Sequence, residues 1–332
     1  MRFARYLFSR LVTYFLVIWI GMTVIFFVPR FLPSDPVTAA LGRVMSSGST
    51  MRPEEVQAMR STLMQLYGLE GTLPEQYLNF MKRAVFGGNF GPSLAFYPTP
   101  VNALIGKALP WTLFLLLTST LIAWVIGNLI GLLAGYQSGK IYSKVLEGIA
   151  IFVYPIPYYI LALILIILFV YINPIFPVSF NVQGTPLSPE FISGAIFNSV
   201  LPALSIIVGA FGWWVLSMKA LSAGIAEEDY VFFARLKGVG DPTIMGRYVM
   251  RNAILPQITL LALNIGTIFN GALIAEILFG YPGLGTLTYT AVVQSDYNLL
   301  MGTISIAIIA VATAALVVDL LYPLFDPRIE YR

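Results

Sequence analysis

The feature that most constrains this chain is a set of six apolar runs, each long enough to cross a lipid bilayer as a helix. The hydrocarbon core of a bilayer is about 30 Å thick, and a helix crosses it in about 20 residues. The runs cover residues 11–28, 111–135, 148–172, 199–218, 254–279 and 300–322. Because lipid offers the backbone no hydrogen-bond partners, we expect an all-α polytopic membrane protein with six transmembrane helices.

Composition agrees with this interpretation. Hydrophobic residues make up 58% of the chain and charged residues 11%, whereas soluble domains are about half apolar and about a quarter charged. The chain contains no cysteine and no histidine, which excludes disulfides, thiol nucleophiles and zinc sites built from these residues. No basic patch with interleaved aromatic residues accompanies the net charge of +3. We therefore expect no catalytic residues, no metal site and no binding of nucleic acid.

The first apolar run could belong to a secretory signal peptide, because Arg2, Arg5 and Arg10 precede it. Its uncharged stretch, residues 11–29, is longer than the roughly 7–15 apolar residues of such peptides. We interpret it as a retained membrane anchor.

The positions of lysine and arginine predict the orientation of the spans. With the N-terminus in the cytoplasm, the inner segments are 1–10, 136–147, 219–253 and 323–332. Together they hold 12 basic residues, whereas the short outer loops 173–198 and 280–299 hold none. Cytoplasmic loops carry the excess of basic residues in membrane proteins. We therefore expect both termini to be cytoplasmic, together with the polar segment between the fourth and fifth spans.

The segment between the first two spans is too long for a hairpin, and long loops follow the charge rule poorly. Within it "RPEEVQAMRSTLMQLYG" has Pro53 near its start, helical spacing and a closing Gly68, and "EQYLNFMKRAV" also predicts a helix. We expect these helices to form a small extracytoplasmic subdomain. The predicted domains are 1–28, 29–110 and 111–332, the last of which includes the cytoplasmic segment 219–253.

Two patterns within the spans concern helix packing. Gly127, Gly131 and Gly135 recur at every fourth residue, so they share one helix face and allow a close neighbour. In "YPIPYY" Pro155 and Pro157 each remove a backbone donor. We interpret the glycines as a packing surface and expect the third span to bend or break at the prolines.

The polar segment "EEDYVFFARLKGVGDPTIMGRYVMRN", residues 227–252, predicts two short helices. The first covers residues 222–237, and Gly238 can end it in a left-handed conformation. Asp241 is a good N-cap for the second, with Pro242 at its first helical position. The second helix is expected to run to about Asn252.

On the first of these helices Tyr230, Phe233, Ala234 and Lys237 fall on one face. An aromatic surface surrounded by charges favours a docking partner over a solvated loop. The candidate docking residues of this segment are Glu228, Asp229, Tyr230, Phe233, Ala234, Arg235, Lys237, Gly238, Asp241, Arg251 and Asn252.

The stretch "EDYVFFARLKGVGDPTIMGRYVMRNAILP" resembles the EAA loop of ABC-importer permeases, in the variant of the dipeptide/oligopeptide permease family. Further stretches resemble the same family in its order. They are "LYGLEGTLPEQY", "GGNFGPS", "LPWTLFLLL", "AEILFGYPGLG", "SDYNLLMG" and "VVDLLYPLFDPRIEYR". Together they extend over nearly the whole chain, so the resemblance is specific although each stretch alone is weak.

The chain departs from the family pattern at several positions. The general EAA pattern has Glu-Ala-Ala where this chain has Phe232, Phe233 and Ala234. Tyr248 stands where a histidine is common, Asn89 stands where the family often has aspartate, and Ser34 stands where glycine is usual. These departures remove no catalytic group, and Tyr248 affects only the detail of docking.

The resemblance implies a type I ABC importer permease fold in a bacterial or archaeal inner membrane. It implies a second, related permease, two ABC ATPase subunits that bind ATP and Mg²⁺, and an extracytoplasmic solute-binding protein, with no cofactor in this chain. The EAA-like helix would lie in a cleft of an ATPase and convert nucleotide-driven closure into movement of the spans. The resemblance also implies an extracytoplasmic turn at Tyr281, Pro282, Gly283 and Gly285.

Other classes of protein fit the sequence less well. A membrane enzyme or an ion-coupled carrier or channel needs ionisable groups within the spans. Glu276 and Asp319 are the only ones well inside them, and both lie near helix ends. We interpret them as satisfied carboxylates that cap "YPGLG" or face Arg328. The stretch "GYQSGKI" lacks the glycine spacing and the Ser or Thr of a phosphate-binding loop, so we expect ATP hydrolysis in another chain.

The substrate stays open at this point between peptides and oligosaccharides. Nickel is less favoured, because the chain lacks the cysteine and histidine that nickel prefers as ligands.

Overall fold

The computed structural model describes residues 2–31, 35–46, 52–268 and 272–325. This part of the chain is helical, and its only β pairing is an isolated bridge between Pro92 and Pro100. The α-helices are α1 (Arg2–Phe31), α2 (Pro36–Ser46), α3 (Pro53–Tyr67), α4 (Leu73–Met81), α5 (Val101–Tyr136), α6 (Ile141–Val153), α7 (Tyr158–Ile166), α8 (Pro189–Ala226), α9 (Asp229–Leu236), α10 (Asp241–Thr243), α11 (Arg251–Thr267), α12 (Leu273–Leu278), α13 (Leu284–Val293) and α14 (Tyr297–Phe325). Three π-helical stretches, η1 (Lys82–Phe86), η2 (Ile167–Ile172) and η3 (Ile244–Met250), extend α4, α7 and α10.

Four of the described helices, α1, α5, α8 and α14, are long and apolar enough to cross a membrane. A fifth span results if α6 is taken together with α7 and η2, which are bent by 93° relative to it. The last apolar run expected before α14, residues 254–279, is divided between α11 and α12. The prediction of a helical, polytopic membrane protein is confirmed, and the six-span count is approximate.

The bend in the third span lies where the prolines predicted it. α6 ends at Val153 and α7 begins at Tyr158, with Pro155 and Pro157 in between. Proline has no N–H to continue the helical hydrogen bonds, and its ring disfavours helical geometry in the preceding residue. Gly209 and Gly212 of α8 let this helix approach both sides of the break closely, at Tyr158 and at Tyr154 respectively.

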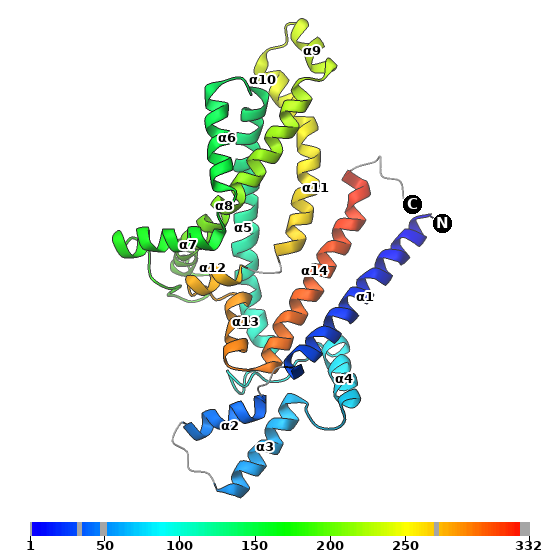
Figure 1. Cartoon of the computed structure of the whole chain (residues 1–332), viewed down its shortest axis with the longest axis vertical. Helices are drawn as coiled ribbons and strands as arrows, with labels where there is room; N and C mark the ends of the chain where they lie inside the picture. Colours follow the sequence, from blue (N-terminus) through cyan, green and yellow to red (C-terminus); the bar gives the residue numbers. More distant parts are fainter. Residues whose placement is uncertain (1, 32–34, 47–51, 269–271, 326–332) are drawn as a thin grey trace.

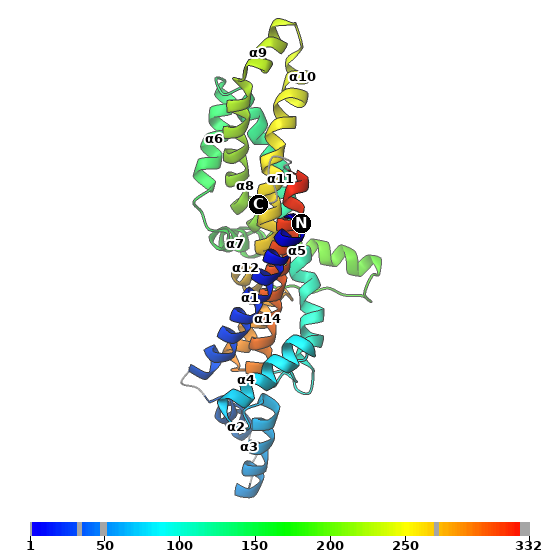
Figure 2. The same ribbon diagram turned by 90° about the vertical axis from the view of Figure 1, so that its right-hand side faces the viewer.

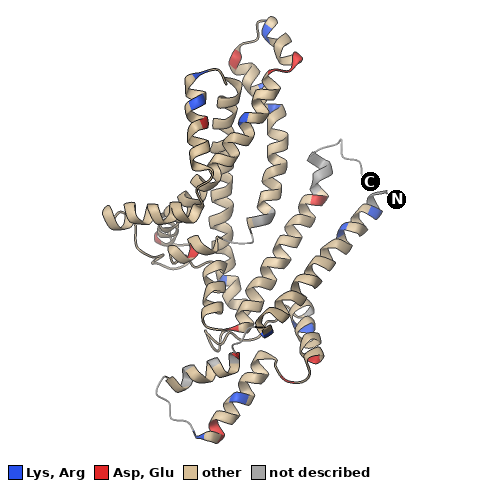
Figure 3. Ribbon diagram, viewed as in Figure 1, with Lys and Arg blue, Asp and Glu red and all other residues tan. Residues whose placement is uncertain are grey.

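The polar segment and the outer subdomain lie at opposite ends of the molecule. α9 and α10 form one end, α2 and α3 form the other, and the apolar helices run between them (Figures 1 and 2). Lys, Arg, Asp and Glu gather mainly at these two ends, whereas the helices between are largely free of charge (Figure 3). This separation is what a membrane requires of a chain that crosses it several times.

The glycine face of α5 lies against α8. A Cβ on Gly131 would stand 2.5 Å from the carbonyl oxygen of Val215, and one on Gly127 would overlap the side chain of Trp214. A Cβ on Gly135 would overlap Ser222. Each of the three positions therefore requires glycine for the two backbones to come this close.

The two helices predicted between the first two spans are confirmed as α3 and α4. Gly68 ends α3 with φ 64, a left-handed conformation that glycine adopts easily. Glu55 accepts the N–H of Arg52 at 2.9 Å, and Glu75 accepts the N–H of Thr72 at 2.7 Å, so each closes the first turn of its helix. These backbone hydrogen bonds, with side-chain bonds to the same residues, lower the pKa of both carboxyl groups.

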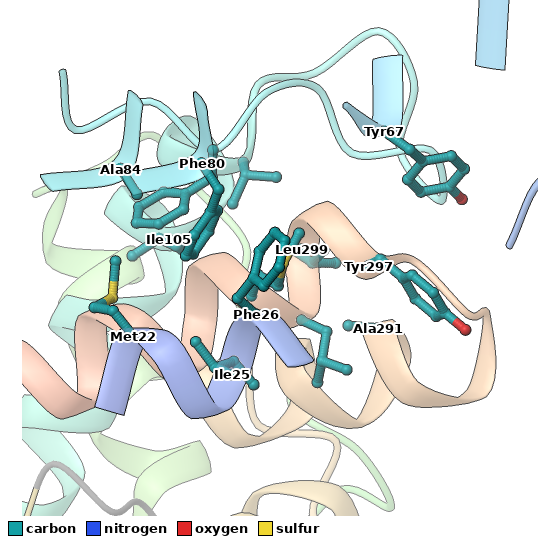
Figure 4. Packing of buried hydrophobic residues seen from close by; sticks show 14 of the residues in the cluster. Met22, Ile25, Phe26, Tyr67, Phe80, Ala84, Ile105, Ala291, Tyr297 and Leu299 are labelled. Carbon is teal, nitrogen blue, oxygen red and sulfur yellow. The ribbon is translucent and has the colours of Figure 1, made fainter. Parts of the chain in front are cut away.

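A shared core joins the outer subdomain to the membrane helices (Figure 4). Phe26 of α1 is fully buried, and its ring centroid lies 5.6 Å from that of Phe80 in α4. Ile105 of α5 and Leu299 of α14 belong to the same cluster. α3 and α4 therefore share one core with α1, α5 and α14.

Candidate coupling site

Within the polar segment, the short helix α9 lies between the end of α8 and the start of α10. α8 continues to Ala226, and Glu227 and Glu228 separate it from α9. The predicted single helix over residues 222–237 was therefore wrong in its first part, because residues 222–226 complete the long span. At its other end α10, η3 and α11 follow one another without a gap from Asp241 to Thr267. α9 thus connects the ends of two long helical elements.

Gly238 ends α9 as predicted. Its φ is 77, its N–H donates to the carbonyl of Arg235 at 2.9 Å, and the N–H of Val239 donates to Ala234 at 3.2 Å. This pair of bonds is the Schellman motif, in which a left-handed residue follows the helix. No atom lies within 4 Å of a Cβ placed on Gly238. The demand for glycine is therefore conformational, at a cost of about 1–2 kcal/mol for other residues.

One face of α9 is buried against the protein. Val231 and Ala234 are buried, together with Ile244 of η3 and Leu132 of α5. Ala234 was predicted to share the docking face with Tyr230, Phe233 and Lys237, and this prediction was wrong. Its small side chain lets α9 lie close to the ends of the spans.

The opposite face of α9 is apolar and exposed. Phe232, Phe233 and Leu236 are 56%, 59% and 66% exposed, and Tyr230 is also exposed. The two phenylalanine rings are 6.3 Å apart. Glu228, Asp229, Lys237 and Arg251 are exposed around this face. Because α9 is at the end of the molecule, outside the apolar spans, these side chains face water unless a partner covers them (Figure 1).

Polar contacts hold the exposed face in position. Asp241 accepts a hydrogen bond from the hydroxyl of Tyr136, at the end of α5, at 2.6 Å. The guanidinium of Arg235 lies 5.5 Å from the ring centre of the same tyrosine. Asn252 donates to the hydroxyl of Tyr230 at 3.0 Å. α9 is therefore attached to α5 and α11 as well as to α8.

Asp241 has a different role from the predicted one. The N-cap of α10 is Gly240, and Asp241 and Pro242 occupy the first helical positions. Its carboxylate binds Tyr136 across 105 residues of sequence. Nothing in the local sequence distinguishes such a partner from an N-cap.

The turn at "YPGLG" is buried. Tyr281 is inaccessible to solvent, packs edge-on against Trp111 and Phe180, and lies 3.1 Å from Ser199 through its hydroxyl. Pro282, the next residue, is half-buried. The turn joins α12 to α13 and packs against α5, the loop before α8 and α8 itself. Its predicted extracytoplasmic position stays a prediction.

Glu276 is the acidic residue that this turn surrounds. Its carboxylate is fully buried and accepts the N–H of Gly285 at 2.6 Å, the N–H of Thr286 at 3.2 Å and the hydroxyl of Thr112 at 2.8 Å. A Cβ on Gly283 would overlap this carboxylate. The prediction that Glu276 caps "YPGLG" is confirmed. Gly283 and Gly285 are both needed for the close approach of its carboxylate.

A second buried carboxylate, Asp296, was not singled out from the sequence. One oxygen accepts from Ser93 Oγ at 2.5 Å and from the N–H groups of Leu94 and Ala95 at 2.8 and 2.9 Å. The other accepts the N–H of Leu299 at 3.1 Å, in the first turn of α14. Asp296 therefore caps α14 and holds the outer loop on it.

The neighbouring residues strengthen this junction. Asn298 donates to the carbonyls of Leu66 and Pro92, both at 3.0 Å, and the hydroxyl of Tyr67 donates to the carbonyl of Ser295 at 3.4 Å. Three stretches far apart in sequence, "LYGLEG", "GGNFGPS" and "SDYNLLMG", thus meet in one polar network. No pattern in the sequence marks this network, because most of its hydrogen bonds go to backbone groups.

Asp319 pairs with the first span. It lies 3.1 Å from a guanidinium nitrogen of Arg10, whereas the alternative partner Arg328 is outside the described residues. Among the described residues no three acidic side chains come together as a metal site would require.

Spans that are fixed both to an outer subdomain and to an exposed aromatic helix at the other end suit a transport subunit operated by a soluble partner. The family model for binding-protein-dependent transport system inner membrane components matches residues 127–331, and the N-terminal model of such components matches residues 3–106. The chain belongs to this family and is a permease subunit of an ABC importer.

Three relatives illustrate the similarity. The chain is 32% identical over 325 residues to the oligopeptide transport system permease protein AppB of Bacillus subtilis, covering 95% of this chain and 96% of the relative. It is 30% identical to the di/tripeptide transport system permease protein DppB of Pseudomonas aeruginosa, covering 94% and 95%. It is 28% identical to the inner membrane ABC transporter permease protein YejB of Escherichia coli, covering 98% of each chain.

Proposed function

We propose that this chain forms half of a translocation pathway for oligopeptides, and that α9 is the element on which an ATPase subunit acts. The observation that carries the docking role is the exposed face of Phe232, Phe233 and Leu236 on a helix whose other face is buried. Exposed aromatic side chains on a fixed helix are typical of residues that a partner protein buries.

The contacts of α9 support a mechanical role. A force on the exposed face passes to α8 through the short turn and to α11 through Tyr230 and Asn252. It passes to α5 through Arg235, which lies over the ring of Tyr136. Deeper in the membrane α5 and α8 are in backbone contact at the glycine face. Movement of α9 would therefore shift these helices as a group, because packed helices resist independent sliding.

The remaining parts of the proposal follow from the family. The partners are a second permease chain, two ATPase chains that bind ATP and Mg²⁺, and a solute-binding protein that delivers substrate to the subdomain at residues 29–110. The names of AppB and DppB favour peptides over oligosaccharides as the substrate. Both termini and α9 face the cytoplasm of a bacterial or archaeal cell.

Replacing Phe232 and Phe233 together by alanine is expected to lower ATP-dependent uptake of a labelled oligopeptide about tenfold or more. A central aromatic side chain at an interface contributes about 2 kcal/mol or more to binding. The measurement uses the complete transporter with its solute-binding protein in proteoliposomes, and retention of the ATPase subunits on the purified permease pair is measured in parallel.

Ile141→Ala is the matched control, because Ile141 is 82% exposed at the start of α6 and lies outside α9. It should leave uptake and ATPase retention unchanged. Equal losses in the control, or full uptake in the double variant, would contradict docking through α9. Uptake that needs no ATP would favour an ion-coupled carrier, and uptake of oligosaccharide in place of peptide would contradict the proposed substrate.

The orientation can be measured with cysteine, which this chain lacks. Ser179→Cys, in the exposed loop before α8, is expected to react with a membrane-impermeant thiol reagent added outside intact cells. Ser138→Cys, in the exposed turn between α5 and α6, is expected to react only after permeabilisation. Ser222 is unsuitable as an inner site because it is buried on α8. The reverse labelling pattern would place α9 outside and remove its role.

A further inference from the structure

The break between α6 and α7 leaves backbone carbonyl groups without hydrogen-bond partners. Pro155 and Pro157 have no N–H to donate, and the N–H groups of Tyr154 and Ile156 donate back into α6, both at 2.9 Å. No donor in the described part of the chain reaches the carbonyls of Tyr154, Pro155 and Ile156. The break therefore presents three consecutive free acceptors.

These carbonyls lie at the depth of the membrane core. Two glycines of α8 pack against the break, Gly212 beside Tyr154 and Gly209 beside Tyr158. They are six and nine residues from the end of the apolar run 199–218. At 1.5 Å per residue they are roughly 9–14 Å inside a hydrocarbon core about 30 Å thick. At this depth irregular backbone is tolerated only where protein buries it or where it lines a water-filled cavity.

Within this chain the break is exposed and not buried. A hollow separates part of it from α8, with Ile156 and Pro157 on one side and Ile206 and Ala210 of α8 on the other. Tyr154 and Pro157 are exposed. The free carbonyls therefore need donors from outside the chain.

The kind of donor can be narrowed by chemistry. Lipid tails have none, and the backbone N–H groups of a neighbouring helix are already bonded within that helix. Water has donors, and so does a peptide that passes in an extended form, because its N–H groups are not paired within its own chain. Free carbonyls at membrane depth therefore favour a position on an aqueous pathway over one facing lipid or a partner helix.

Aromatic side chains flank the free carbonyls. The rings of Tyr154 and Trp213 of α8 are stacked, with centroids 6.1 Å apart, and both residues are exposed. Tyr158 and Tyr159 follow the break, with ring centroids 6.0 Å apart. The hydroxyls of these three tyrosines make no hydrogen bond to any residue that the structure describes. Such rings offer an apolar face and a polar tip, which suits side chains of varied chemistry.

We propose that the break at residues 154–157 lies on the translocation pathway and binds the backbone of an extended peptide. The peptide N–H groups donate to the free carbonyls of Tyr154, Pro155 and Ile156, and water occupies these acceptors between passages. Main-chain hydrogen bonds give affinity that does not depend on the sequence of the peptide. The inference rests on the proposed transport of oligopeptides and adds the place at which the chain holds them.

The test measures access to the break in the complete transporter, in proteoliposomes with its solute-binding protein. Ile156→Cys is expected to react with a charged, membrane-impermeant thiosulfonate added on both sides, with the label located by mass spectrometry. Phe152→Cys is the control. Phe152 is 73% exposed, and Ala150, two residues earlier, packs on α8, so Phe152 is on the opposite side of α6. It should react only with a lipid-soluble maleimide.

Substrate should protect the cysteine at the break. Saturating binding protein loaded with an oligopeptide is expected to slow the reaction of Ile156→Cys about fivefold or more during ATP turnover. The same peptide N-methylated at its central amides lacks the donors, and at saturation it should slow the reaction less than about twofold. If Ile156→Cys does not assemble, Ala210→Cys gives the same measurement from the α8 side of the hollow.

A reaction rate at the break as low as that of Phe152→Cys would show that lipid or a second permease chain covers it, which overturns the proposal. Equal rates with and without peptide, or equal protection by the two peptides, also overturn it. ATP-dependent peptide uptake by the wild-type transporter is measured alongside. Uptake without protection removes this binding site and leaves the proposed function in place, whereas absence of uptake removes both.

Discussion

Replacing Gly131 by valine is expected to prevent α5 and α8 from packing at their native distance. A Cβ at this position stands 2.5 Å from the carbonyl oxygen of Val215 and 2.8 Å from the Cβ of Met218. The carbonyl oxygen belongs to the backbone, so no change of rotamer relieves the clash. Overpacking costs about 1–3 kcal/mol when side chains can adjust, and here we expect a cost at or above the upper end.

The measurement is the yield and thermal midpoint of the purified complex. A loss of about 3 kcal/mol corresponds to a fall of roughly 6–12 °C for a protein of a few hundred residues. Gly106→Val is the control, because Gly106 is on the same helix and no atom lies within 4 Å of its Cβ. If both variants behave as the wild type does, the close approach of α5 and α8 is wrong.

Replacing Asp296 by alanine is expected to detach the outer loop from α14. The carboxylate is buried and satisfies Ser93, two backbone N–H groups of the loop and one of the first turn of α14. A buried donor without a partner costs about 1–3 kcal/mol. We therefore expect a loss of about 3 kcal/mol or more, together with faster proteolysis of residues 87–100.

Asp35→Ala provides the comparison, because Asp35 is exposed and accepts the N–H of Val37 at 3.0 Å at the start of α2. Loss of such a cap costs about 1 kcal/mol. Asp296→Asn retains one acceptor oxygen and should recover part of the stability. A loss in Asp296→Ala no larger than in Asp35→Ala would show that the junction does not hold the outer subdomain.

The periodicity of α9 predicted an arc of residues but not the direction in which it faces. At about 100° per residue, Tyr230, Phe233 and Ala234 lie within one arc, and Val231 lies 60° beyond Ala234. The structure buries Val231 and Ala234 and exposes Phe232 and Leu236. A composition of aromatic and charged residues on all sides cannot choose between these faces, because the choice depends on which face the ends of α5 and α8 cover.

Glu276 and Asp241 show that contacts with nearby residues can be predicted from the sequence, whereas contacts with distant residues cannot. A lone acid beside "YPGLG" at the end of an apolar run is predicted to cap the turn, because the donors that it needs are within ten residues. Its contact with Thr112, and that of Asp241 with Tyr136, join residues more than 100 positions apart. An aspartate before proline carries the same local signal whether it caps its own helix or binds another.

Features that depend on neighbouring residues and on the solvent can be predicted from the sequence. They are the apolar runs that match a bilayer, helix α3, the end of α9, the break at Pro155 and Pro157, and the left-handed residues Gly68 and Gly238. These follow from backbone geometry and hydrogen bonding within one or two turns. The packing of whole helices sets which face of α9 is exposed, and it brings three distant stretches together at Asp296. Such contacts depend on the placement of whole helices, which local propensity does not specify.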